Sequence, residues 1–243
     1  RPNIAYMVII GDITAKDAEK KLKKALKKWA PAEVPQHAYA KTAVPAAQRV
    51  VMVDKPSAVQ SVVWLGNIID LPHGHPDIEP LRVANQILGG GTLGRLFTNL
   101  REDKAFTYGA YSNFGVDELN ATFGASAKVR NEVTDSAITE FLNEIGRMRT
   151  EAVSEDDLIA AKASLSGSFG RSLESPASAA NFALNIARYD LSADYYNNYL
   201  ARLDAVTAED VLRVSNQYMD ADHLTITVVG KAQDVAGKLS AFG

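Results

Sequence analysis

The chain has 243 residues, of which 47% are hydrophobic and 23% charged, with a formal net charge of −3. This composition is typical of a globular protein with a sizeable core, in one large domain or two small ones. It excludes the strongly basic surface that nucleic-acid binding requires. The absence of cysteine excludes a disulfide framework, a thiolate metal site and a cysteine nucleophile. No apolar run approaches the roughly 20 residues of a membrane-spanning helix.

The beginning of the chain predicts a strand followed by a helix. Residues 3–10 form an apolar run closed by Gly11, which indicates a buried strand, and Thr14 is a candidate N-cap for a helix over residues 15–29. The chain enters this strand directly from Arg1. We therefore expect further sequence upstream, and localisation stays open between the cytoplasm and the bacterial periplasm.

The next elements follow in chain order. Residues 30–47 contain three prolines and no sustained periodicity, which predicts a linker. Beyond it, alternating apolar patterns predict strands at 48–54, 59–66, 107–115, 119–127 and 223–229. Helical spacing and capping signals predict helices at 77–88, 93–103, 131–149, 154–172, 176–190, 193–203 and 207–219, with a short helix after the last strand to residue 242.

The two ends of the chain resemble each other. Residues 3–11 and residues 223–230 are both apolar strands that end in glycine and precede a helix. Such a repeated strand–glycine–helix unit suggests a duplicated domain. On this interpretation residues 1–30 are the tail of an upstream repeat, 31–47 are a linker, and 48–243 are a complete second copy.

A glycine-rich stretch from Gly89 to Gly94 formally fits the pattern G-x-G-x-x-G. A dinucleotide site needs a strand before this pattern, whereas residues 80–88 are helical in spacing, and no Lys-Ser/Thr pair follows to make a phosphate loop. We interpret the glycines as a helix C-terminus in the left-handed region and a loop that yields when a ligand enters. A nucleotide-binding domain remains the weakest alternative.

The histidines do not predict a metal site. They lack the spacing that places two or three ligands on one rigid element, and neither H-x-x-E-H nor H-E-x-x-H occurs. The four are His37, His73, His75 and His223.

The most informative stretch lies between residues 93 and 108. Apolar residues at helical spacing predict a buried helix face, and Arg101 falls just off that face. Tyr108 begins the next strand, seven residues later. A guanidinium and a phenol can both donate hydrogen bonds to a carbonyl oxygen or an oxyanion. The alternative is a surface arginine paired with an acid and a half-buried strand tyrosine.

Together these motifs resemble a known family. The order and spacing of several segments are similar to the C-terminal half of pitrilysin/insulinase-type zinc metallopeptidases, a family that includes the mitochondrial processing peptidases. The resemblance covers nearly the whole chain, and its segments are Leu88–Gly91, Arg95–Phe97, Leu100–Glu102, Tyr108, Pro72–Asp77, Val153–Leu158 and Ala205–Val211.

The resemblance implies a fold and a division of labour. It implies an α+β fold, in which a two-layer arrangement has an antiparallel or mixed sheet covered by helices on one face, of the LuxS and processing-peptidase type. The zinc and its H-x-x-E-H motif would belong to the missing N-terminal half, so this chain would hold no cofactor and would be inactive alone. Arg101 and Tyr108 would support catalysis by holding the substrate carbonyl or oxyanion, and Gly89, Gly90 and Gly91 would take part in substrate binding.

The implied partners are the zinc-bearing half or partner subunit and a peptide substrate, without nucleic acid or a membrane span in this segment. The alternative function is a non-catalytic scaffold or partner subunit of the same family. The presence of both Arg101 and Tyr108 favours the peptidase half. Phe106 and Thr107 stand where the family more commonly has a small aliphatic pair.

Overall fold

The computed structural model describes residues 1–35 and 37–243. These form two compact units, one made of residues 1–40 and 166–201 and the other of residues 41–165 and 202–243. In the described part of the chain, no helix combines the length and the apolar character that crossing a membrane requires.

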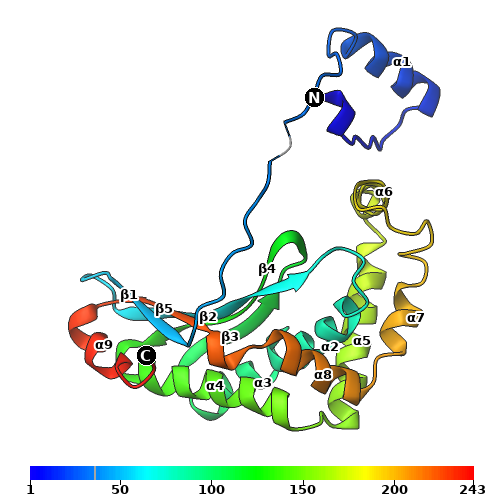
Figure 1. The fold of residues 1–243 in the computed structure, drawn as a ribbon. Coiled ribbons are helices and arrows are strands. Elements are labelled where there is room, and N and C mark those ends of the chain that lie inside the picture. Colours follow the sequence, from blue (N-terminus) through cyan, green and yellow to red (C-terminus); the bar gives the residue numbers. More distant parts are fainter. Residues whose placement is uncertain (36) are drawn as a thin grey trace. The chain divides into compact units, whose positions relative to one another are not determined.

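The larger unit is built on one mixed sheet with the strand order β1-β5-β2-β4-β3 (Figure 1). β1 and β5 run parallel, and the other neighbouring strands are antiparallel. The strands are β1 Arg49–Asp54, β2 Gln60–Leu71, β3 Thr107–Phe114, β4 Asp117–Arg130 and β5 Thr225–Gly230. The α+β fold class predicted from the sequence is confirmed.

Helices cover one face of this sheet, as Figure 1 shows for α4 and α8. The buried core lies between them and includes Phe123 of β4 and Phe141 and Ile138 of α4, which are all fully buried. The elements of this layer are α2 Ile78–Gly89, α3 Arg95–Phe97, the π-helical turn η2 Thr98–Asp103, η3 Asn131–Val133, α4 Thr134–Thr150, α8 Ala208–Tyr218, η4 Ala221–His223 and α9 Ala232–Leu239.

A buried carboxylate ties the start of α2 to α8. Asp77 precedes α2, and its side chain accepts hydrogen bonds from the Tyr218 hydroxyl at 2.8 Å and from Arg213 at 2.7 Å. Burial alone would raise the pKa of Asp77, but the hydrogen bonds from Arg213 and Tyr218 outweigh it and leave that pKa below its ordinary value. Burial and the neighbouring carboxylate raise the pKa of Tyr218, so its hydroxyl stays a donor.

The opposite face of the sheet is open, and the edge strand β1 and the central strand β2 expose large apolar side chains there. Strand alternation places every second residue there. Val51, Val53, Val62 and Trp64 remain 36–47% exposed on this face. We call these positions and the residues that alternate with the buried ones on β3 and β4 the open face.

The indole of Trp64 lies over a pair of glycines on the open face. Gly66 and Gly124 are directly opposite each other on β2 and β4. A Cβ at Gly66 would come within 2.4 Å of the indole and 2.6 Å of the Phe123 carbonyl oxygen, and one at Gly124 within 2.9 Å of the indole. Glycine is therefore required at Gly66 by close packing, not by backbone conformation.

The smaller unit is helical. It contains η1 Pro2–Ile4, α1 Ala15–Ala25 and α6 Pro176–Arg188, while α5 Glu155–Ser172 and α7 Tyr199–Asp204 each extend from one unit into the other. Thr14 caps α1 as predicted, because its hydroxyl accepts the Asp17 N–H at 3.1 Å. Stacked aromatic rings of Phe169, Phe182, Tyr196 and Tyr199 join its helices.

The prediction of a buried strand at residues 3–10 is wrong for this chain. Residues 2–4 form a short 3-10 turn, and residues 5–10 form neither helix nor strand and are exposed. A strand needs hydrogen-bonding partners on a neighbouring strand, and none of the five strands in the described residues pairs with this segment.

Most other elements occur where they were predicted, with shifted ends. β2 and β4 reach Leu71 and Arg130, five and three residues beyond the predicted ends at 66 and 127. The helix predicted at 193–203 is limited to α7, since residues 193–198 form turns. Residues 30–35 and 37–47, predicted as a linker, form no helix or strand.

Candidate functional site

The structure brings Arg101 and Tyr108 together. Arg101 lies in η2, and its guanidinium carbon is 5.4 Å from the centre of the Tyr108 ring, which is close enough for a cation–π contact. The same carbon is 5.9 Å from the ring of Phe97, which in turn contacts Tyr111. Tyr108 is 85% exposed and the Arg101 side chain 38% exposed, so both groups are accessible to a ligand.

A β-bulge decides the direction of Tyr108. The pairing of β3 with β4 shifts register between Thr107 and Ala110. In a regular strand Tyr108 would share a face with Ala110, which is buried beneath the helices, and Tyr111 would lie on the opposite face. The extra residue resets the alternation, so that both tyrosines lie on the open face.

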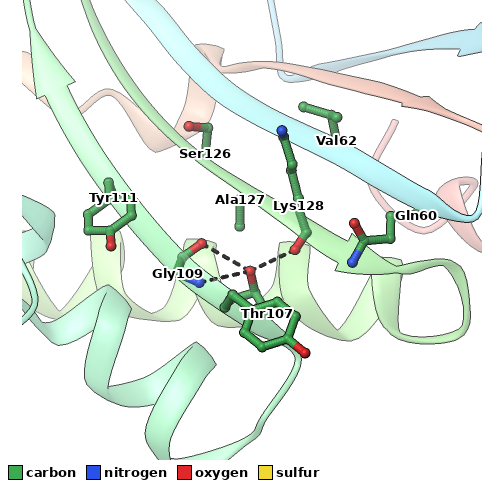
Figure 2. Close-up of a pocket in the computed structure, with 9 residues that line it drawn as sticks. Gln60, Val62, Thr107, Gly109, Tyr111, Ser126, Ala127 and Lys128 are labelled. Carbon is green, nitrogen blue, oxygen red and sulfur yellow. Dashed lines mark hydrogen bonds between the residues drawn. The ribbon is translucent and has the colours of Figure 1, made fainter.

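The bulge is held by a single hydroxyl (Figure 2). The Thr107 hydroxyl oxygen lies 2.6 Å from the Lys128 carbonyl oxygen and 3.0 Å from that of Gly109, and it accepts the Gly109 N–H at 3.1 Å. Thr107 is buried, so these hydrogen bonds satisfy backbone groups that water does not reach. Thr107 is therefore a positioning residue for Tyr108.

The turn that joins η2 to β3 is strained. Ala105 has φ 51, in the left-handed region that residues with a Cβ seldom occupy. Arg130, at the end of β4, donates a hydrogen bond of 2.7 Å to the Ala105 carbonyl oxygen. Strain of this kind persists where the surroundings determine the conformation, and here the turn sets how far Arg101 lies from Tyr108.

Two open pockets flank Tyr108. One, of about 420 Å³, lies between Tyr108 and Tyr111 on the open face, where Figure 2 shows the side chains of Val62, Ser126 and Lys128 on the same side of the sheet. The other, of about 400 Å³, is lined by Arg101, Ala105, Phe106 and Arg130. Gln60, Thr107 and Tyr108 line both pockets.

The glycines predicted to bind substrate lie away from the pockets beside Tyr108. None of Gly89, Gly90 and Gly91 lines either pocket beside Tyr108. The prediction of a left-handed helix end is also wrong, because the C-cap Gly90 has φ −73. Lack of space for a side chain explains two of these glycines. A Cβ at Gly89 would lie 2.6 Å from the Ser112 backbone nitrogen, and a Cβ at Gly90 would lie 2.6 Å from Gln86 Oε1.

The residues present do not fit a zinc ion. Within residues 1–35 and 37–243, no three His, Asp or Glu side chains lie close enough together to ligate a metal. His73 and His75 share the loop between β2 and α2, and His223 lies in η4. His73 Nδ1 lies 3.2 Å from Glu118 and His223 Nδ1 lies 2.8 Å from Asp220.

Sequence reasoning missed several residues that line these pockets. Gln60 and Val62 lie on a predicted strand whose faces were not assigned, whereas Lys128 and Arg130 lie beyond the predicted end of the other strand at residue 127. The sequence did contain a signal for these faces. Small residues alternate with Ser126 and Lys128 along β4, and if the small residues face the core, Ser126 and Lys128 must lie on the other, exposed face of the sheet.

Comparison with known proteins identifies the family. A family model described as the peptidase M16 inactive domain matches residues 1–165, about two thirds of the chain. The chain therefore belongs to the M16 peptidase family as its inactive domain, which confirms the resemblance found in the sequence.

Individual relatives agree with this assignment. The uncharacterized zinc protease YmxG of Bacillus subtilis (strain 168) is 32% identical over 105 residues, covering 42% of this chain and 25% of that protein. A peptidase M16 inactive domain from Pseudomonas fluorescens superposes with a TM-score of 0.79 at 24% identity, over 91% of this chain and 52% of that one. A Helicobacter pylori protease gives 0.80 at 18% identity, over 91% and 53%.

The chain thus spans a quarter of the length of the curated relative and about half of each of the two solved chains. At these identities the solved structures show a shared fold. They do not by themselves carry a substrate or a reaction to this chain.

Proposed function

We propose that this chain is the metal-free, substrate-contacting half of a zinc metallopeptidase that hydrolyses peptides. The observation that supports it best is the pairing of Arg101 with Tyr108 at the junction of two open pockets. In this proposal a partner half or subunit brings the zinc ion, which would activate the attacking water. The chain by itself is inactive.

Arg101 and Tyr108 would act on the substrate carbonyl. The Arg101 ion pair to Glu102, at 3.3 Å, uses Nε, so the terminal guanidinium nitrogens can donate to a ligand. The Tyr108 hydroxyl is exposed and can donate at the same time. Two donors placed where charge develops on the carbonyl oxygen stabilise the transition state more than the bound substrate. The glycines 89–91 would contribute to substrate binding from a separate surface.

The N-terminal segment supports the presence of a partner half. Residues 4–10 are almost all apolar, yet six of them are 39–58% exposed. The segment resembles β5, which lies between β1 and β2 and leads through Lys231 into α9. We propose that residues 1–30 complete a sheet of the zinc-bearing half, with 31–47 as the linker and 48–243 as the inactive domain.

The proposal is tested by reassembly. The chain is combined with the zinc-bearing half of the same protein, and the turnover of a mixed peptide library is measured. We expect cleavage only in the combined sample, and a fall of more than tenfold in kcat for Arg101→Ala and for Tyr108→Phe, because each removes one oxyanion donor.

Matched controls change the same chemical groups away from the pockets. Arg49→Ala removes an exposed guanidinium at the other edge of the sheet, and Tyr39→Phe removes an exposed hydroxyl from the linker. Both should leave kcat within about twofold of the parent. Unchanged turnover in the Arg101 and Tyr108 variants would instead favour the scaffold alternative, in which this chain only supports its partner.

A further inference from the structure

The pocket between Tyr108 and Tyr111 has an unbalanced charge. Within the described residues, no Asp or Glu lines either pocket beside Tyr108, whereas Arg101, Lys128 and Arg130 all do. A cavity lined by one sign of charge concentrates ligands of the other sign.

The three cations differ in how far they are already neutralised. Arg101 has an ion pair to Glu102 at 3.3 Å, and Arg130 has one to Glu132 at 3.7 Å. Lys128 is exposed on the open face and has no carboxylate within ion-pair distance in residues 1–35 and 37–243. Of the three cations, Lys128 is therefore the one whose charge no carboxylate offsets.

The remaining lining of this pocket is mostly apolar. Lys128 is directly opposite Val62 in the pairing of β4 with β2, and Tyr111 is opposite Ser126 one row along. A side chain that enters between Tyr108 and Tyr111 would contact Val62 and the aliphatic stem of Lys128 with its methylene groups. Its end would lie within reach of the Lys128 ammonium group and the Gln60 amide, which can both donate hydrogen bonds.

We infer that the pocket between Tyr108 and Tyr111 is a side-chain subsite that selects acidic residues, and that Lys128 determines this preference. A carboxylate on a short apolar stem, as in glutamate, satisfies both parts of the lining. A lysine or arginine side chain would meet the uncompensated charge of Lys128. The inference rests on the proposed function, because it places the subsite beside the carbonyl that Arg101 and Tyr108 hold.

Binding and cleavage are measured separately to test the inference. Peptides that differ only in one residue beside the cleaved bond (Glu, Gln, Leu or Lys) are bound to the assembled protein after zinc removal, and Kd is measured by fluorescence anisotropy. The zinc-loaded assembly then gives kcat/KM for the same peptides. We expect the Glu peptide to exceed the Lys peptide about fivefold in both measurements, as exposed charge pairs typically allow.

Charge reversal provides the decisive comparison. Lys128→Glu should reverse the order of the Glu and Lys peptides, and Lys128→Gln should abolish the difference. The matched control, Arg49→Glu, reverses a charge on the open face of β1 and should keep the parent order. Lys128 is exposed and its side chain makes no hydrogen bond in the described residues, so both variants should fold.

The outcomes separate this inference from the proposed function. If binding shows the preference and its reversal but no peptide is cleaved, the subsite stands and the peptidase role fails. If the Glu and Lys peptides bind equally, or Lys128→Glu leaves their order unchanged, the subsite inference is wrong even when cleavage occurs. A preference for Leu that no Lys128 variant alters would likewise overturn it.

Discussion

The buried hydrogen bond between Tyr218 and Asp77 gives a prediction with a defined size. Tyr218→Phe removes a donor that lies 2.8 Å from a carboxylate oxygen, in a side chain that is 3% exposed. Hydrogen bonds to charged groups contribute about 1.5–3 kcal/mol. Arg213 keeps its own bond at 2.7 Å, so the carboxylate retains one partner. We therefore expect a loss of about 2 kcal/mol, and a fall in Tm of roughly 4–8 °C for a chain of this size.

The pH dependence distinguishes this bond from a simple packing effect. The pKa of Asp77 is below its ordinary value in the folded protein, so its ionised form contributes stability that is present above pH ~4 and is lost as pH falls further. Removing the Tyr218 donor makes that pKa less depressed. The stability difference between parent and variant should thus be constant from pH 6 to 8 and shrink as pH falls below ~4.

Urea unfolding provides the assay. A Trp29→Phe background leaves Trp64, which lies on the sheet, as the single fluorescent tryptophan. Tyr108→Phe is the control, because it removes a hydroxyl from a residue that is 85% exposed and should cost less than about 0.5 kcal/mol. A Tyr218→Phe cost equal to the control, or one that does not change between pH 7 and pH 3, would refute the reasoning.

Three further predictions follow from the packing around the sheet. Gly66→Ala places a Cβ 2.6 Å from a backbone carbonyl oxygen of β4 and 2.4 Å from the Trp64 indole. It should therefore destabilise the chain by about 1–3 kcal/mol and shift the tryptophan emission, and an unchanged emission spectrum and urea midpoint would count against the described packing. Thr107→Val keeps the side-chain shape but removes the bulge hydrogen bonds, so chemical denaturation should show a free energy of unfolding lower by about 1–2 kcal/mol, and kcat of the assembly should fall. A kcat equal to that of the parent would show that the bulge does not position Tyr108. Val8→Asp alters an exposed residue, so the Tm of the isolated chain should stay within about 1 °C of the parent. Its affinity for the zinc-bearing half, measured by titration calorimetry, should fall about tenfold because the proposed interface buries this side chain; an unchanged affinity would exclude residues 4–10 from that interface.

The N-terminal segment shows a limit of periodicity. Residues 3–10 have the composition of a buried strand, but a strand forms only against a partner, and no strand within the described residues pairs with them. Residues 223–229 have the same pattern, and there Thr225–Gly230 do form β5, because β1 and β2 lie on either side. Local sequence therefore predicted the tendency in both places, and neighbouring strands decided the outcome.

The glycine stretch shows a second limit. Composition indicated flexibility and a left-handed helix end at Gly89–Gly91, whereas the structure gives Gly90 φ −73 and leaves no room for a Cβ at Gly89. The steric contact of Gly89 with Ser112 cannot be inferred from spacing, since it depends on how α2 packs against β3.

The sequence by itself predicted nearly all helices and strands, because periodicity and capping residues are local properties of the chain. Its resemblance to a known family supplied the fold class and pointed to Arg101 and Tyr108 as the candidate pair. The tertiary structure decided what surrounds that pair. The bulge at Thr107, the strained turn at Ala105 and the position of Lys128 depend on the register between β3 and β4. Register is set by contacts between residues 9 to 22 positions apart, and a shift of one residue would reverse every side chain of β3 between the core and the open face.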